Sequence, residues 1–371
     1  MAIWIALILA GALFLGQQKF FEKMWLRGLR VTLRFGEQGI EVGEPCKLRE
    51  VIRNEKRMPL PALQVKFATT TNFHFEDDGG VMTTDKVYRA DVFSVAGRKQ
   101  VTRTLTFHGK MRGYYQISDI QLVAQDYFFS KRFAKAMSNQ AAIYVYPAKL
   151  SLLPFEETYR QIMGELIARR SFHEDPFYFR GIRPYQPYDS MKHINWKSSA
   201  KHGELLVNSF EHTYSREVCI LLNVNCHAVF KKKEVQEFSI SIASTLSERF
   251  LWDGIPVAIY TNGKDALSDN RIEAPRGAGK AYRITIDRQL ARIDLEQTAE
   301  NFREIMERQC ESGRTNVQYI VISSEHNDEL LDSFARLRSS LSGMCMIVPE
   351  TREEKWQLQD GMVGWEVETL G

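Results

Sequence analysis

Polar side chains that could bind a metal ion stand at the ends of two strand-like runs in the C-terminal half of the chain. Asn223, Asn225 and His227 lie at and just after the end of EVCILLNV, and Glu325 directly follows VQYIVISS. Magnesium requires oxygen ligands with at least one carboxylate, whereas imidazole suits zinc or copper. Glu325 is the one carboxylate of this set, because the asparagines offer uncharged carbonyl oxygens. We therefore expect a polar pocket that forms part of a binding face and holds no metal ion or other cofactor, with a metal-dependent site as the alternative.

The elements that must position these side chains are alternating strands and helices. From Glu217 onward, apolar strand-like runs alternate with stretches of helical periodicity. The first of these stretches has an apolar stripe at spacings of three and four, formed by Val235, Phe238, Ile242, Leu246 and Phe250. The pattern predicts a doubly wound, mainly parallel sheet over residues 217–371. Ligands of such sheets bind at the carboxyl ends of strands, so the loops after Leu222, Tyr260 and Ile322 are the expected place for a site.

Residues 30–150 have a different rhythm. Short alternating runs such as VTLRF, KLREVIRN and QVTRTLTF are separated by turn-type stretches such as EVGEP and AGRK. Alternation with a turn every ten or so residues predicts an antiparallel β-sandwich of the immunoglobulin-like kind. This part shows no cluster of metal ligands or nucleophiles, so we expect a structural or interaction domain.

Residues 1–24 are typical of a membrane anchor. The run from Ala2 to Gly16 carries no charge, but it is shorter than the roughly twenty residues that comfortably span a bilayer. We expect Phe20 and Phe21 to extend it, with Trp4 and Trp25 in the two aromatic belts. A basic stretch before the run and a small-residue cleavage site after it are both missing, which favours a retained transmembrane helix over a cleaved signal.

The basic residues near this run all follow it, namely Lys19, Lys23, Arg27 and Arg30. The positive-inside rule therefore places the bulk of the chain in the cytoplasm, as a single-pass protein of the cell membrane. The five cysteines are odd in number and scattered, without a CxxC pair, which agrees with a reducing compartment.

The overall composition describes an ordinary globular protein. Of 371 residues, 44% are hydrophobic and 26% charged, which argues against a disordered or fibrous chain. The net charge of +3 is too small to indicate a nucleic-acid partner.

Residues 151–216 connect the two predicted domains and contain the unusual segment RGIRPYQPYDSMKHINWKSSAKHGELLVNSFE. It resembles the signature of domain-of-unknown-function family 58, which are von Willebrand factor A-like proteins often encoded beside MoxR-type AAA+ ATPases. The matching positions are Arg183, Tyr185, Asp189, Lys192, Ile194, Trp196, Ala200, Lys201, Leu205 and Val207. One departure is Tyr188, which stands where the family has glycine. The upstream stretch MRGYYQISDIQLVAQDYFF is also similar to a family element.

The resemblance implies a von Willebrand A-like fold for residues 217–371. Such a domain usually has a metal site written D-x-S-x-S after its first strand, and NVNCH stands there in this chain. An amide has replaced the anchoring aspartate, so the resemblance implies a degenerate site.

The resemblance also implies a non-enzymatic scaffold or adaptor that works with a MoxR-type ATPase in chaperone-like or envelope-related assembly. The alternatives are a metal-dependent binding protein or hydrolase at the remnant site, and polysaccharide or peptide binding by a sandwich outside the cell.

Within the signature we expect Trp196 to pack between the segment and the α/β sheet, as a clamp, because an indole is costly to leave in water. Arg183 and Asp189 are expected to pair and lock the turn, while Tyr185, Lys192 and Lys201 complete a partner-facing surface. Replacing Trp196 with alanine should then destabilise the cytoplasmic part by a few kcal/mol.

Three further motifs do not support a catalytic function. PRGAGKAY lacks the first glycine and the final Ser or Thr of a phosphate-binding loop. Asp189, His193 and Ser199 lie near one another along the chain, but their spacing does not establish a hydrolase triad. The basic and aromatic residues of 180–216 are partly offset by acidic ones, which argues against single-stranded nucleic acid.

Overall fold

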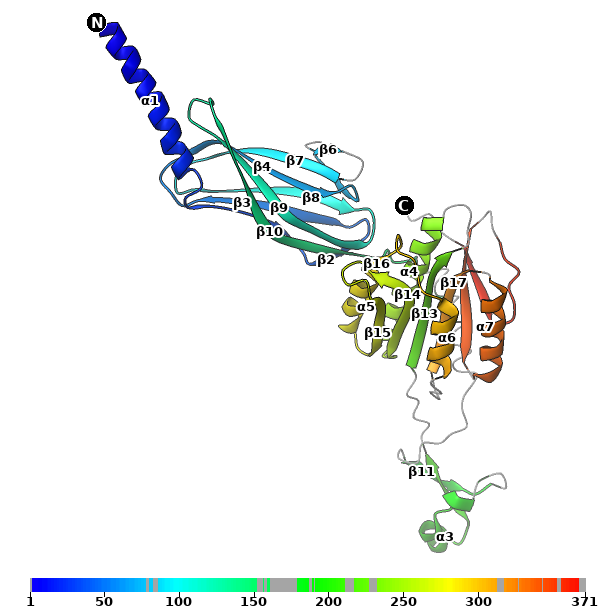
Figure 1. Cartoon of the computed structure of the whole chain (residues 1–371). Coiled ribbons are helices and arrows are strands. Elements are labelled where there is room, and N and C mark those ends of the chain that lie inside the picture. The colour runs from blue at the N-terminus through cyan, green and yellow to red at the C-terminus, as the bar shows by residue number, and fades with distance from the viewer. Residues whose placement is uncertain are drawn as a thin grey trace.

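The computed structural model shows a long N-terminal helix, a β-sandwich and an α/β domain in succession, with a small lobe beside the α/β domain (Figure 1). It describes residues 2–77, 80–82, 86–151, 156, 159–160, 179–186, 189, 191–210, 217–226, 232–311, 317–325, 327–341, 343–351 and 355–366. Tyr188 and His227 lie outside the described residues.

Helix α1 (Ala2–Met24) is long and apolar enough to cross a membrane. Its exposed apolar part ends near Gly16, and its last turns pack on the sandwich. Phe21 is fully buried there and Trp25 almost fully. The expectation that these two aromatic residues extend the span and anchor it in the second aromatic belt is therefore wrong, because both belong to the sandwich core.

The sandwich consists of two sheets, in the antiparallel arrangement that the alternating pattern predicts. One sheet has the order β1-β3-β8-β5 and the other β2-β10-β9-β4-β7-β6, with β2 and β10 as the one parallel pair in these two sheets among the described residues. The strands are β1 (Leu29–Phe35), β2 (Gly39–Glu41), β3 (Pro45–Asn54), β4 (Leu60–Thr70), β5 (Phe73–Phe75), β6 (Gly80–Met82), β7 (Lys86–Val95), β8 (Gln100–Gly109), β9 (Gly113–Gln125) and β10 (Arg132–Tyr146).

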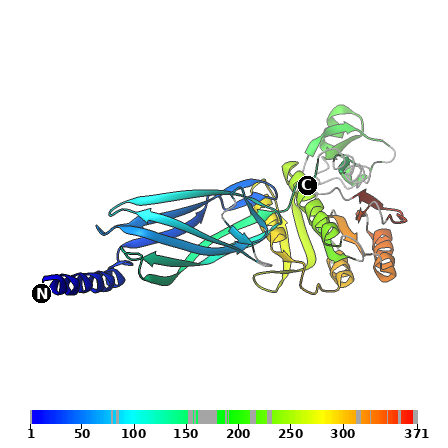
Figure 2. The same cartoon turned by 90° about the horizontal axis from the view of Figure 1, so that it is seen from above.

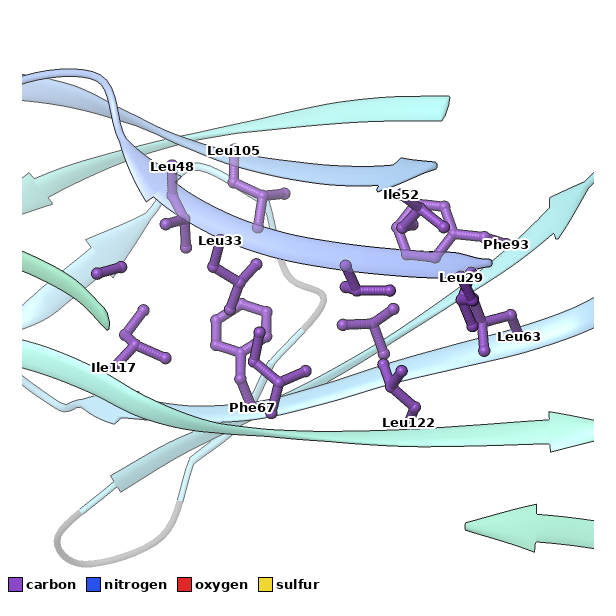
Figure 3. Packing of buried hydrophobic residues seen from close by; sticks show 14 of the residues in the cluster. Leu29, Leu33, Leu48, Ile52, Leu63, Phe67, Phe93, Leu105, Ile117 and Leu122 are labelled. Atoms are coloured by element: carbon purple, nitrogen blue, oxygen red, sulfur yellow. The ribbon is translucent and has the colours of Figure 1, made fainter. Parts of the chain in front are cut away.

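Apolar side chains from the two sheets meet in the sandwich core (Figure 3). In β3, buried and exposed residues alternate along the strand, so Leu48 and Ile52 point inward. They face residues such as Phe67 and Leu122 from the opposite sheet. This period of two is what makes one face of each sheet apolar.

The same core encloses a carboxyl group, Glu50 of β3, which has no exposed surface. Burial, followed by the negative charge of Asp91, raises the pKa of Glu50 to about 8. Arg103 lies opposite Glu50 on β8, and its Nη1 donates to Asp91 Oδ1 at 2.7 Å. The carboxyl and the ion pair therefore share one polar cluster inside the sandwich.

The α/β domain has a seven-stranded sheet in the order β15-β14-β13-β17-β18-β19, with β16 paired to β14. Strands β13, β14, β17, β18 and β19 are parallel to their neighbours in this group, and β15 and β16 are antiparallel to β14. The strands are β13 (Glu217–Cys226), β14 (Val257–Asp265), β15 (Arg271–Gly277), β16 (Ile293–Asp294), β17 (Val317–Ser324), β18 (Met344–Glu350) and β19 (Met362–Glu366).

Helices cover both faces of this sheet, as a doubly wound fold requires. The helices are α4 (Lys232–Trp252), α5 (Tyr282–Ala291), α6 (Phe302–Glu311) and α7 (Asp328–Ser340). On β13, Ile220 and Leu222 belong to the core formed with α4 and α5, whereas Leu221 belongs to the core formed with α6 and α7. The α4 stripe predicted from the sequence is fully inside. Strand β15 was not predicted.

The lobe contains β11 (Phe179–Pro184), the 3₁₀ turn η1 (Met191–His193), α3 (Trp196–His202) and β12 (Leu206–Phe210). Strands β11 and β12 pair antiparallel, and Figure 1 shows β11 and α3 apart from the α/β sheet. Ile194, Leu206 and Val207 are buried and form the lobe's own small core.

The Glu50→Gln variant should change how stability depends on pH. Because the folded state raises the pKa of Glu50, this group's contribution is fully present below the ordinary pKa of about 4.5 and is lost as the pH rises toward 8. Chemical denaturation gives the free energy of unfolding at pH 5 and at pH 8. Between these two values, the free energy of unfolding of the parent should fall by roughly 3 kcal/mol more than that of the variant. Equal losses in both proteins would contradict the buried, protonated carboxyl.

Candidate functional site

An amide network occupies the carboxyl edge of the α/β sheet. Asn223, at the end of β13, is almost completely buried. Its Nδ2 donates to Ser323 Oγ at 3.0 Å and to Glu325 Oε2 at 2.8 Å. Its Oδ1 accepts hydrogen bonds from Asn262 Nδ2 and from the backbone N–H of Asn225, both at 2.9 Å. The structure therefore brings Asn223, Asn225 and Glu325 together, as predicted from the strand ends.

The direction of these hydrogen bonds decides what the edge can bind. The carbonyl oxygen of Asn223 already has two donors, and its NH₂ group points to the Glu325 carboxylate. The Asn223 amide therefore uses its own oxygen and one carboxylate oxygen of Glu325 in hydrogen bonds, and both are the kind of atom that a divalent cation takes as a ligand. Within the described ranges, no three His, Cys, Asp or Glu side chains lie close enough to hold a metal ion. The edge can act through hydrogen bonds and shape.

A pocket with a volume of about 240 Å³ opens beside this network. Its lining combines carboxylates, amides and one guanidinium: Asn225, Ala299, Glu300, Asn301, Arg303, Glu325, Asn327, Glu329 and Leu330. Asn327 caps α7 by accepting from the Glu329 N–H, and Arg303 Nη1 pairs with Glu329 Oε2 at 2.9 Å. The pocket therefore lies between the first turns of α6 and α7, where loops after parallel strands usually bind ligands.

In the lobe, Arg183 and Asp189 form the predicted pair. Arg183 Nη1 and Nη2 donate to the two carboxylate oxygens of Asp189, each at 2.6 Å. Hydrogen bonds from Arg183 hold the pKa of Asp189 below its ordinary value, and the Gln186 N–H adds to this effect. The bidentate geometry fixes the turn between β11 and η1.

Trp196 does not clamp the lobe to the α/β domain. Its side chain is 66% exposed, at the first residue of α3. Asn195 caps this helix and Gly203 ends it in the left-handed conformation, so α3 is held by its ends and by buried Ser199. The buried apolar residues of the lobe are Ile194, Leu206 and Val207. The prediction that Trp196→Ala destabilises the chain by a few kcal/mol therefore has no support in the structure.

The remaining signature residues lie on the surface or partly buried. Lys192 and Lys201 are exposed, and Tyr185 is half-buried. The hydroxyl of Ser199 donates to Asn195 O and accepts from the Leu206 N–H, which gives it a structural role. Since Asp189 is held by Arg183, these contacts give no support to a catalytic triad.

Arg112, which is not among the site residues predicted from the sequence, joins the sandwich to the α/β domain. Its Nη1 donates to the carbonyl oxygens of Leu290, Ala291 and Ile293 at 3.0, 3.2 and 2.8 Å. Its Nε lies 2.8 Å from Glu237 Oε2 of α4. The guanidinium thus caps the C-terminus of α5, where a positive charge is favourable. The sequence shows Arg112 only as part of the MRGYY element. Its carbonyl partners could not be predicted because they lie about 180 residues further along the chain.

Replacing Arg112 with alanine should destabilise the chain by on the order of 2–3 kcal/mol, because it leaves partly buried Glu237 and the α5 carbonyl oxygens without their partner. Lys110, an exposed neighbour, provides the control. The free energy of unfolding of the Lys110→Ala variant should lie within about 0.5 kcal/mol of that of the parent. If both variants melt alike, the joint is not held by Arg112.

The Asn223→Asp variant should make the stability of the chain depend on a divalent metal ion. It places a second carboxylate against Glu325, so like-charge repulsion should cost on the order of 2 kcal/mol at pH 7 in a chelator. Stability should recover at lower pH, where the pair shares a proton, or on addition of manganese. Thermal unfolding measures both effects, with half-buried Asn225→Asp as the milder control. A variant as stable as the parent would show that Asn223 does not donate to Glu325.

No curated protein matches this chain. A cohesin from Archaeoglobus fulgidus matches 35% of this chain and 98% of its own length, with 9% identity and a TM-score of 0.22. A type II cohesin domain from Acetivibrio cellulolyticus matches 32% of this chain and 94% of its own, with 10% identity and a TM-score of 0.25. Identities and TM-scores as low as these do not indicate a shared function. One family model matches residues 181–356, which contain the signature lobe and most of the α/β sheet. The family is described as protein of unknown function DUF58, and this match supports assigning the chain to that family.

Proposed function

We propose that this chain is a non-enzymatic scaffold or adaptor, anchored in the cell membrane by α1, with its domains in the cytoplasm. In this proposal its α/β domain is von Willebrand A-like, and a MoxR-type AAA+ ATPase is the principal partner. The pair would serve chaperone-like or envelope-related assembly. The observation that supports the proposal is the Asn223 network, in which the amide Nδ2 donates to Ser323 and Glu325 at the edge where a von Willebrand A-like domain would hold a divalent cation.

The network supports binding in preference to chemistry. Asn223 and Asn262 are uncharged and hydrogen-bonded to each other, so neither can transfer a proton or act as a nucleophile at neutral pH. The adjoining pocket is open and polar, with Glu300, Glu325 and Arg303 in its lining. Such a surface recognises charged and hydrogen-bonding groups of a partner protein.

The lobe supplies a second surface with the composition of a protein interface. Trp196 and Met191 are 66% and 73% exposed, and Ile182 and Leu205 are also exposed. Tryptophan and methionine are enriched at interfaces, and large apolar side chains left in water commonly mark a binding site. The lysines at 192 and 201 lie in the same lobe and would favour an acidic partner.

The location is supported by two independent features. Basic residues follow the exposed apolar part of α1, which favours a cytoplasmic orientation for the rest of the chain. All five cysteines are buried free thiols, which agrees with a reducing compartment.

Trp196→Ala tests the lobe as a binding surface. The variant should bind a MoxR-type ATPase at least tenfold more weakly, because buried tryptophans at interfaces contribute about 2 kcal/mol or more. Its melting should match the parent, because the side chain is exposed. Co-purification with the ATPase in ATP and in ADP measures the binding, which should depend on the nucleotide.

Trp252, which is 64% exposed on α4, is the matched control. Trp252→Ala should bind the ATPase normally. Equal binding by both variants and the parent would remove the lobe from the interface, and no binding by the parent would refute the partner. Calorimetry of the parent with magnesium, manganese and calcium should show no heat of binding, whereas measurable heat would favour the metal-dependent alternative.

A further inference from the structure

The hairpin that joins β9 to β10 carries an aromatic tip next to α1. Tyr127, Phe128 and Phe129 follow one another in this turn and are 39%, 57% and 60% exposed. Figure 1 shows the hairpin rising beside α1, and the rings of Phe14 and Phe128 lie 5.7 Å apart. Three consecutive exposed aromatic residues at one turn are unusual for a surface in contact with water alone.

Polar contacts fix the tip at a definite height on α1. Gln17 Nε2 donates to Asp126 Oδ2 at 2.8 Å, and Gln18 Nε2 donates to Ser130 Oγ at 2.9 Å. Asp126 is fully buried; burial opposes its ionised form, but hydrogen bonds from Ser130 and Gln17 outweigh this and lower its pKa to about 2. The hairpin is thus docked on α1 directly below the apolar run, which ends at Gly16.

This docking sets the depth of Phe128. Phe14 lies three residues before Gln17, which is about 4.5 Å along a helix axis. Phe128 contacts Phe14, so its ring lies level with the apolar run instead of with the polar residues below it. If α1 crosses a bilayer, the tip cannot remain in bulk water.

Exposed basic residues lie at the end of the sandwich that packs on the last turns of α1, and one of them, Lys131, is paired with Glu22. Six basic residues lie in the turns that follow α1, β3 and β7, and in the hairpin itself. They are Arg27, Arg57, Arg98, Lys99, Lys131 and Arg132, and all six are exposed. Basic residues and exposed aromatic side chains at the same end of a domain are typical of surfaces that lie on lipid headgroups.

We propose that the hairpin at 126–131 inserts its aromatic tip into the membrane interface beside α1. This inference rests on the proposed function, in which α1 spans the bilayer. The occupant of the aromatic surface is lipid, because the surface is continuous with α1 and its basic surroundings match anionic headgroups. The hairpin gives the sandwich a second point of contact with the membrane, which limits how far α1 and the sandwich can tilt together.

The insertion also fits the length of the anchor. The uncharged run of fifteen residues spans about 22 Å as a helix, which is less than the roughly 30 Å of a bilayer core. A short span draws the flanking structure toward the membrane. Aromatic rings are the side chains that tolerate this interfacial region best.

Depth-dependent quenching in the full chain tests the proposal. A fluorophore is attached to one of three cysteine variants, Phe128→Cys, Leu9→Cys in α1 or Tyr88→Cys in β7. Tyr88 is 51% exposed and lies about 23 Å along β7 from the end of that strand nearest α1. The five native cysteines are buried and should react slowly. The chain is reconstituted in phosphatidylcholine vesicles with a quarter phosphatidylglycerol and lipids spin-labelled near the top of the acyl chain.

We expect strong quenching at position 128, quenching at position 9, and emission at position 88 like that of a label in water. Quenching at 9 but not at 128 would overturn the aromatic insertion while leaving α1 as a span. An unquenched label at position 9 would instead refute the membrane anchor itself. A label at 128 that is shielded from water but not quenched would show that protein, such as a second copy of the chain, covers the tip.

Discussion

The arrangement of this molecule depends on one buried guanidinium. Arg112 lies at the end of the sandwich that faces the α/β domain, and it binds three carbonyl oxygens at the end of α5 and a carboxylate of α4. Nearby, Lys149 Nζ lies 3.1 Å from Glu248 and 3.2 Å from Asp287. Because Arg112 is buried and makes these contacts at once, it fixes the sandwich against the α/β domain. The strands run from α1 toward that domain in Figure 2, so the joint lies at the end opposite the anchor.

The features that the sequence predicted well are those that repeat. Strand alternation marked the sandwich, and the three-and-four spacing marked α4, because burial on one face imposes those periods directly. The site at Asn223 and Glu325 was also predictable, since parallel strands must bring their carboxyl ends to one edge. The pairing of Arg183 with Asp189 followed from charge and proximity along the chain.

The features that could not be predicted depend on contacts between distant segments. Phe21 and Trp25 continue an apolar helix in the sequence, but the sandwich provides a core that takes them out of the membrane-facing surface. Trp196 was assigned to a core because of its size, yet Ile194 and Val207 are enough to fill a lobe this small. Strand β15 is an edge strand whose alternation of polar and apolar residues covers only Arg271 to Ala274 before Pro275, which is too short to distinguish it from a loop.

The amide at Asn223 has a consequence for control. An ion-gated surface changes its affinity when the ion arrives or leaves, so that a cell can switch adhesion by changing ion concentrations. An amide carries no charge at any physiological pH, so Asn223 presents the same uncharged hydrogen-bonding group across that range. Any response of this edge to pH or salt must therefore come from its charged neighbours, such as Glu325 and the Arg303–Glu329 pair.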